Sequence, residues 1–163
     1  MRHVFTYGSL MFPKVWSGIV RHRYPAAAAQ LPGFIRQRVR GQDYPSLARV
    51  TSGAAHSSDS PAPSVDGVLY LDVEDDDLAM LDRFEGSDYC RIEVEVVLRE
   101  PLPAGSSAGS AAGTRVPAET YLFIAREKVE PGPWDSRRFE CEWMERFLRE
   151  FPPPPAPGER GPG

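Results

Sequence analysis

A glycine turn near the N-terminus is the first feature of this sequence that could do chemistry. The turn is the tetrapeptide Tyr7-Gly8-Ser9-Leu10, which follows a β-rich segment at residues 2–6. Glycine lets a backbone approach a ligand closely. Successive N–H groups at such a turn can bind a carboxylate or a developing oxyanion. The turn is therefore a candidate site for an acidic small molecule.

The second candidate is Glu85, which we place at the end of a predicted helix. It lies between Phe84 and Gly86, and Tyr89 follows shortly after. A carboxylate beside apolar rings is disfavoured in its charged form, so its pKa rises. A carboxyl group of that kind can take up and return protons near neutral pH. A turn that offers N–H groups and a carboxylate beside it could bind a small acidic amide and move its proton.

Each of these two features also has an ordinary explanation. Short glycine motifs are frequent in tight turns that bind nothing, and most glutamates are solvated at the surface. Taken alone, each feature favours the ordinary explanation over the functional one.

Other kinds of chemistry find less support in the sequence. The run of aspartates at 75–77 points in different directions on a helix, so it suits a helix N-terminus better than a metal ion. His3, His22 and His56 show no ligand spacing. Ser9 has no Gly-x-Ser-x-Gly elbow around it. We therefore expect no metal, no cofactor and no serine hydrolase.

Composition narrows the class of protein and its partners. A length of 163 residues favours one domain, and the net charge of −4 comes from interspersed acidic and basic residues, which argues against a nucleic-acid partner. The alternating Arg36, Arg38 and Arg40 are expected on the solvent face of a strand. No apolar run reaches the length of a membrane span, and the chain begins directly in a strand pattern. With cysteines that lack metal or redox spacing, we expect a cytoplasmic protein.

The pattern of apolar residues predicts several strands and few helices. The expected strands are 2–6, 27–31, 34–40, 44–50, 65–73, 89–98 and 118–125, and the expected helices are 10–20, 75–84 and 136–151. Ser136 is expected to cap the last helix. Helices are too few for a doubly wound sheet. The predicted fold class is α+β, with a small mixed sheet curled toward a barrel and about three surrounding helices.

Low-complexity segments define the expected domain limits. We predict one domain over residues 1–151, interrupted by flexible loops at 52–65 and 101–117. The Pro/Gly-rich tail at 152–163 cannot extend a helix and is expected to be disordered.

Taken together, the motifs resemble the gamma-glutamylcyclotransferase-like superfamily, and within it the branch named for plant avirulence-induced genes. The order and spacing of the motifs agree with that family from residue 4 to about residue 98, and the strand at 118–125 continues the pattern. The residues that carry the resemblance are 5–11 (FTYGSLM), 31–34 (LPGF), Gly41, Tyr44-Pro45, 65–70 (VDGVLY), 81–86 (LDRFEG), Tyr89 and Arg91.

The resemblance implies a fold, a reaction and a site. The fold is a small mixed β-barrel with surrounding helices. The reaction converts a gamma-glutamyl amide to 5-oxoproline and a free amine, without a cofactor. Glu85 matches the family's catalytic glutamate, and the backbone N–H groups of residues 7–10 hold the substrate. Tyr89 and Tyr121 are expected to face the same cavity.

Two departures leave other functions open. The loops at 52–65 and 101–117 are not family hallmarks, and members of the branch often lack an established substrate. The protein could instead be a non-catalytic small-molecule binding protein of the same fold. A third possibility is protein interaction through the Pro-rich tail. We expect a monomer or a weak homodimer.

Overall fold

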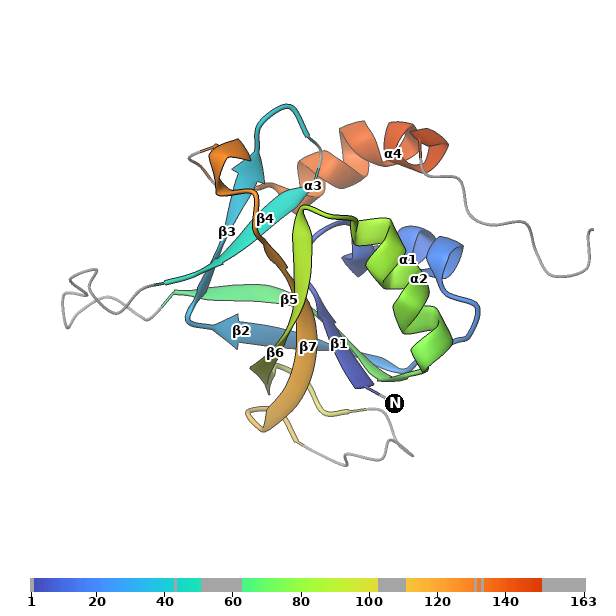
Figure 1. Cartoon of the computed structure of the whole chain (residues 1–163). Helices are drawn as coiled ribbons and strands as arrows, with labels where there is room; N and C mark the ends of the chain where they lie inside the picture. Colours follow the sequence, from blue (N-terminus) through green and yellow to red (C-terminus); the bar gives the residue numbers. More distant parts are fainter. Residues whose placement is uncertain are drawn as a thin grey trace, which may run out of the picture.

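A closed five-stranded barrel forms the centre of the protein (Figure 1). The computed structural model describes residues 2–42, 44–50, 63–102, 111–130, 132 and 134–150. The barrel strands follow one another in the order β1 (Arg2–Thr6), β5 (Ser64–Val73), β2 (Ala26–Pro32), β6 (Tyr89–Leu98) and β7 (Arg115–Phe123). Neighbouring strands are antiparallel except where β1 meets β7 in parallel and closes the barrel.

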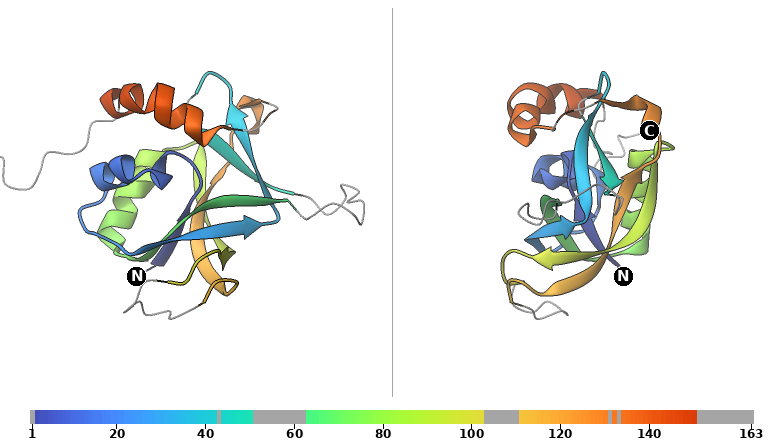
Figure 2. Two further views of the ribbon diagram at one scale, coloured as in Figure 1. Left: turned by 180° about the vertical axis from the view of Figure 1, so that it is seen from behind. Right: turned by 90° about the vertical axis from the view of Figure 1, so that its left-hand side faces the viewer.

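A smaller sheet and a few helices surround the barrel (Figure 2). The sheet has the order β4 (Pro45–Arg49), β3 (Phe34–Val39) and β8 (Val129–Glu130). The helical elements are η1 (Ser9–Met11), α1 (Pro13–Ile19), α2 (Asp75–Glu85), η2 (Arg126–Lys128), α3 (Ser136–Arg138), the π-helical segment η3 (Phe139–Trp143) and α4 (Met144–Glu150). Within the described residues, no helix is both long enough and apolar enough to span a membrane.

Side chains that alternate in direction along the strands form two apolar cores, one on each face of the barrel wall. In β1, Phe5 points into the barrel while Val4 packs on the helix side, as the two-residue period of a strand requires. In β5, Leu69 and Leu71 fill the barrel, whereas Tyr70 between them packs outside it. The helices therefore cover a barrel wall that is apolar on both faces.

The fold confirms the predicted α+β barrel, and the element boundaries shift by a few residues. β5 and β7 begin at Ser64 and Arg115, inside the segments predicted as loops 52–65 and 101–117. The rest of those loops lies mostly outside the described residues, as does the tail at 152–163.

The last helix differs from the prediction in its cap and its regularity. Asp135, rather than Ser136, is the N-cap, and its side chain accepts hydrogen bonds from the amides of Arg137 and Arg138. Asp and Ser are about equally good N-cap residues. The local sequence therefore does not distinguish Asp135 from Ser136, and tertiary contacts determine which of them caps the helix. The π-helical segment η3 interrupts the regular helix that the apolar spacing predicted.

A buried carboxylate anchors the start of α2. Asp77 is fully buried, and it accepts hydrogen bonds from the amides of Arg21 (2.8 Å) and His22 (3.0 Å) and from the Tyr24 hydroxyl (2.6 Å). The Nδ1 atom of the His22 ring lies 2.9 Å from the same carboxylate. Burial opposes ionisation, but these hydrogen bonds hold the pKa of Asp77 below its ordinary value. Asp77 thereby fixes the segment between α1 and β2 to the helix.

Replacing Asp77 should destabilise the protein much more than replacing a neighbouring aspartate. Asp77→Ala removes several hydrogen bonds to a buried carboxylate and should lower the free energy of unfolding by roughly 3 kcal/mol at pH 7. Asp75→Ala, at an exposed position of the same turn, should cost less than about 0.5 kcal/mol. Urea denaturation measures both.

The effect of Asp77 also has a defined pH dependence. Because its folded-state pKa lies below the ordinary value of 3.8, its stabilisation is present above that pH and disappears as the pH falls through the folded-state pKa. Equal losses in the Asp77 and Asp75 variants at pH 7 would show that the buried hydrogen bonds do not stabilise the fold.

Candidate functional site

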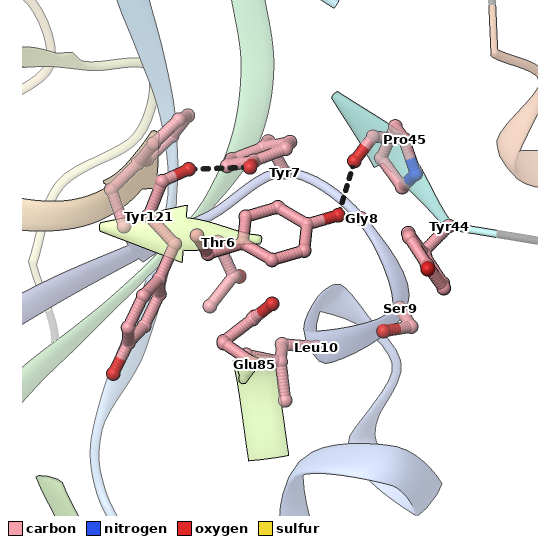
Figure 3. A pocket seen from close by; sticks show the side chains of 11 residues that line it. Thr6, Tyr7, Gly8, Ser9, Leu10, Tyr44, Pro45, Glu85 and Tyr121 are labelled. Carbon is pink, nitrogen blue, oxygen red and sulfur yellow. Dashed lines mark hydrogen bonds between the residues drawn. The ribbon is translucent and has the colours of Figure 1, made fainter. Parts of the chain in front are cut away.

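A small cavity lies where β1 runs into η1 (Figure 3). The end of α2 and the strands β4, β6 and β7 complete its wall. The residues that line it are Phe5, Thr6, Tyr7, Gly8, Ser9, Leu10, Tyr44, Pro45, Glu85, Tyr89 and Tyr121. The structure thus brings every site residue predicted from the sequence to one cavity, although their positions span more than a hundred residues of chain.

The 7–10 turn forms one side of the cavity and leaves its amides available. The amides of Met11 and Phe12 donate to the carbonyls of Gly8 and Ser9 and so close the short helix η1. In the described part of the chain, the amides of Gly8, Ser9 and Leu10 have no recorded acceptor. Such amides can donate to an oxygen anion in the cavity.

Limited space requires glycine at position 8. A Cβ atom there would lie 2.7 Å from Cδ and 2.8 Å from Cγ of Pro45. The Pro45 ring therefore packs directly against the turn and holds β4 close to it.

Glu85 supplies the carboxyl group of the cavity. It is the last residue of α2, which Gly86 ends with a φ of 75° and an amide that donates to the Asp82 carbonyl. Figure 3 shows its half-buried side chain extending from the helix into the cavity. Burial, together with a smaller contribution from the nearby negative charge of Asp82, raises the pKa of Glu85 to about 8. At neutral pH this carboxyl group can both release and accept a proton.

Tyrosine hydroxyls frame the cavity and are already engaged with the backbone. The Tyr7 hydroxyl donates to the carbonyl of Tyr121, and the Tyr89 hydroxyl donates to the carbonyl of Pro45 at 2.7 Å. Burial raises the pKa of both tyrosines well above the ordinary value, with smaller contributions from nearby negative charge. Both hydroxyls therefore remain neutral and fix the positions of the surrounding strands.

Tyr121 contributes its main chain and ring to the cavity, but its hydroxyl points elsewhere. The hydroxyl turns away from the cavity in Figure 3 and donates to Asp82 of α2 at 2.7 Å. The Arg91 side chain adds ion pairs to Asp82 and to Glu119. Tyr121 therefore connects two parts of the site. Its hydroxyl binds α2, which carries Glu85, and its carbonyl in β7 accepts the hydrogen bond from Tyr7.

Four further residues line the cavity that were not predicted as site residues from the sequence: Phe5, Thr6, Tyr44 and Pro45. The one sequence signal for two of them was that Tyr44-Pro45 belongs to the family pattern. Their place in the cavity depends on how β4 packs over β1, which the sequence does not show. A second cavity adjoins the first and shares Ser9, Tyr44, Glu85 and Tyr89 with it. Glu85 thus faces both spaces.

A separate group of possible metal ligands lies outside the cavity. Ligand atoms of His22, Glu74 and Asp76 come within 4.8 Å of one another, although the sequence showed no ligand spacing. All of these residues are exposed, and the His22 ring is already held by Asp77. We assign this group no function.

Comparison with known proteins identifies the family. Residues 4–138 match the family described as gamma-glutamyl cyclotransferase, AIG2-like. The chain belongs to this family. Its relatives include the Arabidopsis thaliana proteins AIG2-like protein C, which is 30% identical over 151 residues (91% of this chain and 72% of the relative), and protein AIG2 C, 28% identical over 150 residues (91% and 78%).

Solved structures of other proteins share the fold. A solution structure from Arabidopsis thaliana is 28% identical, with a TM-score of 0.59 over 92% of this chain and 79% of that one. A structure described as a gamma-glutamyl cyclotransferase has a TM-score of 0.55 at 19% identity, over 79% of this chain and 68% of that one. The second likeness shows the fold alone.

A methyl group at position 8 should damage the cavity of this AIG2-like protein. We expect Gly8→Ala to lower the free energy of unfolding by about 1–3 kcal/mol, because the new Cβ overlaps the Pro45 ring. Thermal denaturation measures the loss. Pro45→Ala removes the overlapping ring atoms, so the double variant should lose less than the sum of the two single variants. Additive losses would show that the Gly8–Pro45 contact is not the constraint.

Proposed function

We propose that this protein is a gamma-glutamyl cyclotransferase that converts a gamma-glutamyl amide to 5-oxoproline and a free amine. The observation that carries the proposal is the Glu85 carboxyl group, with a pKa near 8, in the same cavity as the amides of Gly8, Ser9 and Leu10, which have no acceptor among the described residues. Membership of the AIG2-like family supports it.

The proposed reaction uses a nucleophile that belongs to the substrate. The free α-amine attacks the γ-carbonyl carbon, and a new C–N bond closes the five-membered ring. Glu85 takes a proton from the attacking nitrogen. The bond to the leaving nitrogen then breaks, and Glu85 returns the proton to that nitrogen. One carboxyl group with a pKa near the working pH serves both transfers.

The backbone amides have a separate role in this proposal. A gamma-glutamyl group carries an α-carboxylate, and its γ-carbonyl oxygen becomes negative as the ring closes. The amides of Gly8, Ser9 and Leu10 can donate to these oxygens in a cavity largely shielded from water. The side chains at 7, 89 and 121 shape the space around the glutamyl group.

The two adjoining cavities suggest how the substrate is divided between them. We place the glutamyl group in the cavity lined by the 7–10 turn and the leaving amine in the adjoining one. Glu85 borders both spaces, as proton transfer between the attacking and leaving nitrogens requires.

We further propose that the protein is cytoplasmic and that it acts as a monomer or weak homodimer. Cys90 and Cys141 are both exposed and unpaired, which suits a reducing compartment.

Replacing Glu85 should abolish turnover without unfolding the protein. We expect Glu85→Gln to lower kcat at least about 100-fold, as measured by 5-oxoproline release from glutathione, gamma-glutamyl amino acids and gamma-glutamyl amines. In the folded wild type the pKa of Glu85 is raised from 4.5 to about 8. The Glu85 carboxyl group therefore lowers the free energy of unfolding as the pH rises through that interval. The variant should therefore melt at the same or a higher temperature at pH 7.

Two outcomes would contradict this proposal in different ways. Full activity of Glu85→Gln would remove Glu85 from the mechanism. Tight binding of gamma-glutamyl compounds by the wild type, with no 5-oxoproline from any of them, would instead identify a non-catalytic binding protein.

Asp82 offers a test of which group controls the pH profile. We expect kcat/KM to rise with pH through about 8 as Glu85 ionises. Asp82→Asn removes the negative charge that raises the Glu85 pKa, yet keeps an oxygen that accepts from the Tyr121 hydroxyl. The rise should therefore move to lower pH in this variant. A rise that does not move would belong to the amine of the substrate.

A further inference from the structure

Arg36 lies in an unexpected place behind the 7–10 turn. The sequence placed Arg36 with Arg38 and Arg40 on the solvent face of a strand. In the structure Arg36 is half-buried, and its NH1 atom donates to the carbonyl of Tyr7 at 2.8 Å. Its guanidinium carbon lies 5.3 Å from the centre of the Trp134 ring. Arg36 is therefore fixed between a ring and the main chain of the site.

The partners of Arg36 are unusual for a buried cation. Its recorded hydrogen bonds go to backbone carbonyls, those of Tyr7 and Asp66. The Asp66 carboxylate pairs with Arg99 instead, at 2.9 Å. Burial lowers the pKa of Arg36, and the charge of Asp66 partly offsets this. Placing a cation there costs free energy, and the Tyr7 carbonyl is the contact that connects it to the cavity.

Peptide geometry relates that contact to the amide of Gly8. The Tyr7 carbonyl and the Gly8 N–H belong to one trans peptide group, in which they point in opposite directions. Arg36 holds the carbonyl from outside, since it does not line the cavity, whereas Gly8 does. The Gly8 N–H therefore points away from Arg36 in a residue that lines the cavity, and it has no acceptor among the described residues.

A charged donor on the carbonyl also changes the strength of the N–H. Hydrogen bonds to one end of a peptide group polarise it and strengthen the bond made at the other end. A donor that carries full charge has the larger effect. The Gly8 amide is thereby both oriented and made more positive before any ligand arrives.

We propose that Arg36 is a positioning residue that orients and polarises the Tyr7–Gly8 peptide so that the Gly8 N–H binds an oxygen anion of the substrate. This inference rests on the proposed function for the identity of the anion, which is either the α-carboxylate or the oxyanion formed at the γ-carbonyl. Arg36 acts through the backbone and does not touch the substrate.

The direct test is the amide resonance of Gly8 in Arg36→Met. We expect its ¹H–¹⁵N signal to move upfield, because the carbonyl loses its charged partner. Arg40→Met removes an exposed arginine two residues beyond Arg38 and should leave the signal unchanged. Arg36→Lys keeps a cationic donor, so its Gly8 signal should lie between those of the wild type and of Arg36→Met. A folded Arg36→Met protein with an unmoved Gly8 signal would overturn the proposal.

Binding and kinetics identify the anion. Glutarate, a dicarboxylate without an amine, cannot cyclise and serves as the probe. If the amide holds the α-carboxylate, Arg36→Met should weaken glutarate binding and raise KM roughly tenfold. If it holds the oxyanion, kcat should fall by a similar factor while glutarate binding is retained. Unchanged glutarate binding, KM and kcat would overturn the proposal, whatever the resonance does.

The same experiment separates this inference from the proposed function. A shifted Gly8 signal and weaker glutarate binding, in a protein whose wild type releases no 5-oxoproline, would retain Arg36's role and reject the cyclotransferase. If Arg36→Met does not fold, Arg36→Lys carries the test. That variant should show a Gly8 signal upfield of the wild-type position, and a wild-type signal with altered kinetics would contradict the proposal.

Discussion

The parallel pairing of β1 with β7 is the constraint on which the rest of the structure depends. Val4 aligns with Glu119 across this pair, which closes the barrel. Because the two strands run in the same direction, the chain leaves β1 beside the residues near the end of β7. The Tyr7 hydroxyl consequently reaches the Tyr121 carbonyl, and the turn at residues 7–10 lies over the barrel end. The helix, the proline of β4 and the second cavity are all arranged around that junction.

The sequence predicted those parts of the fold that local patterns determine. The alternation of residues 89–98 and the apolar run at 65–73 gave strands whose limits agree with the structure within a residue. The acidic start and glycine end of α2 likewise located Glu85 at a helix terminus. These features depend on neighbours in the chain, and so a single sequence is enough to indicate them.

The features that the sequence did not predict depend on contacts between distant segments. The stretch around Arg36 alternates like an exposed strand face, and only the packing of β3 against the turn shows that Arg36 points inward. Tyr121 was expected at the cavity, but nothing local indicates that Asp82 receives its hydroxyl. Asp77 was one of three aspartates in a row, and its burial depends on the segment that follows α1. In a run of identical residues, the tertiary structure determines which side chain is buried.

The helix α2 is fastened to the rest of the protein at both ends. Asp77 holds its first turn to the segment before β2, and Asp82 holds its last turn to Tyr121 and Arg91. A helix held at both ends cannot easily fray or detach while the barrel stays folded. The opening that displaces Glu85 should then be the cooperative unfolding of the whole domain. How accurately the Glu85 carboxyl group is positioned therefore depends on the stability of the whole domain and not on the motion of a local loop.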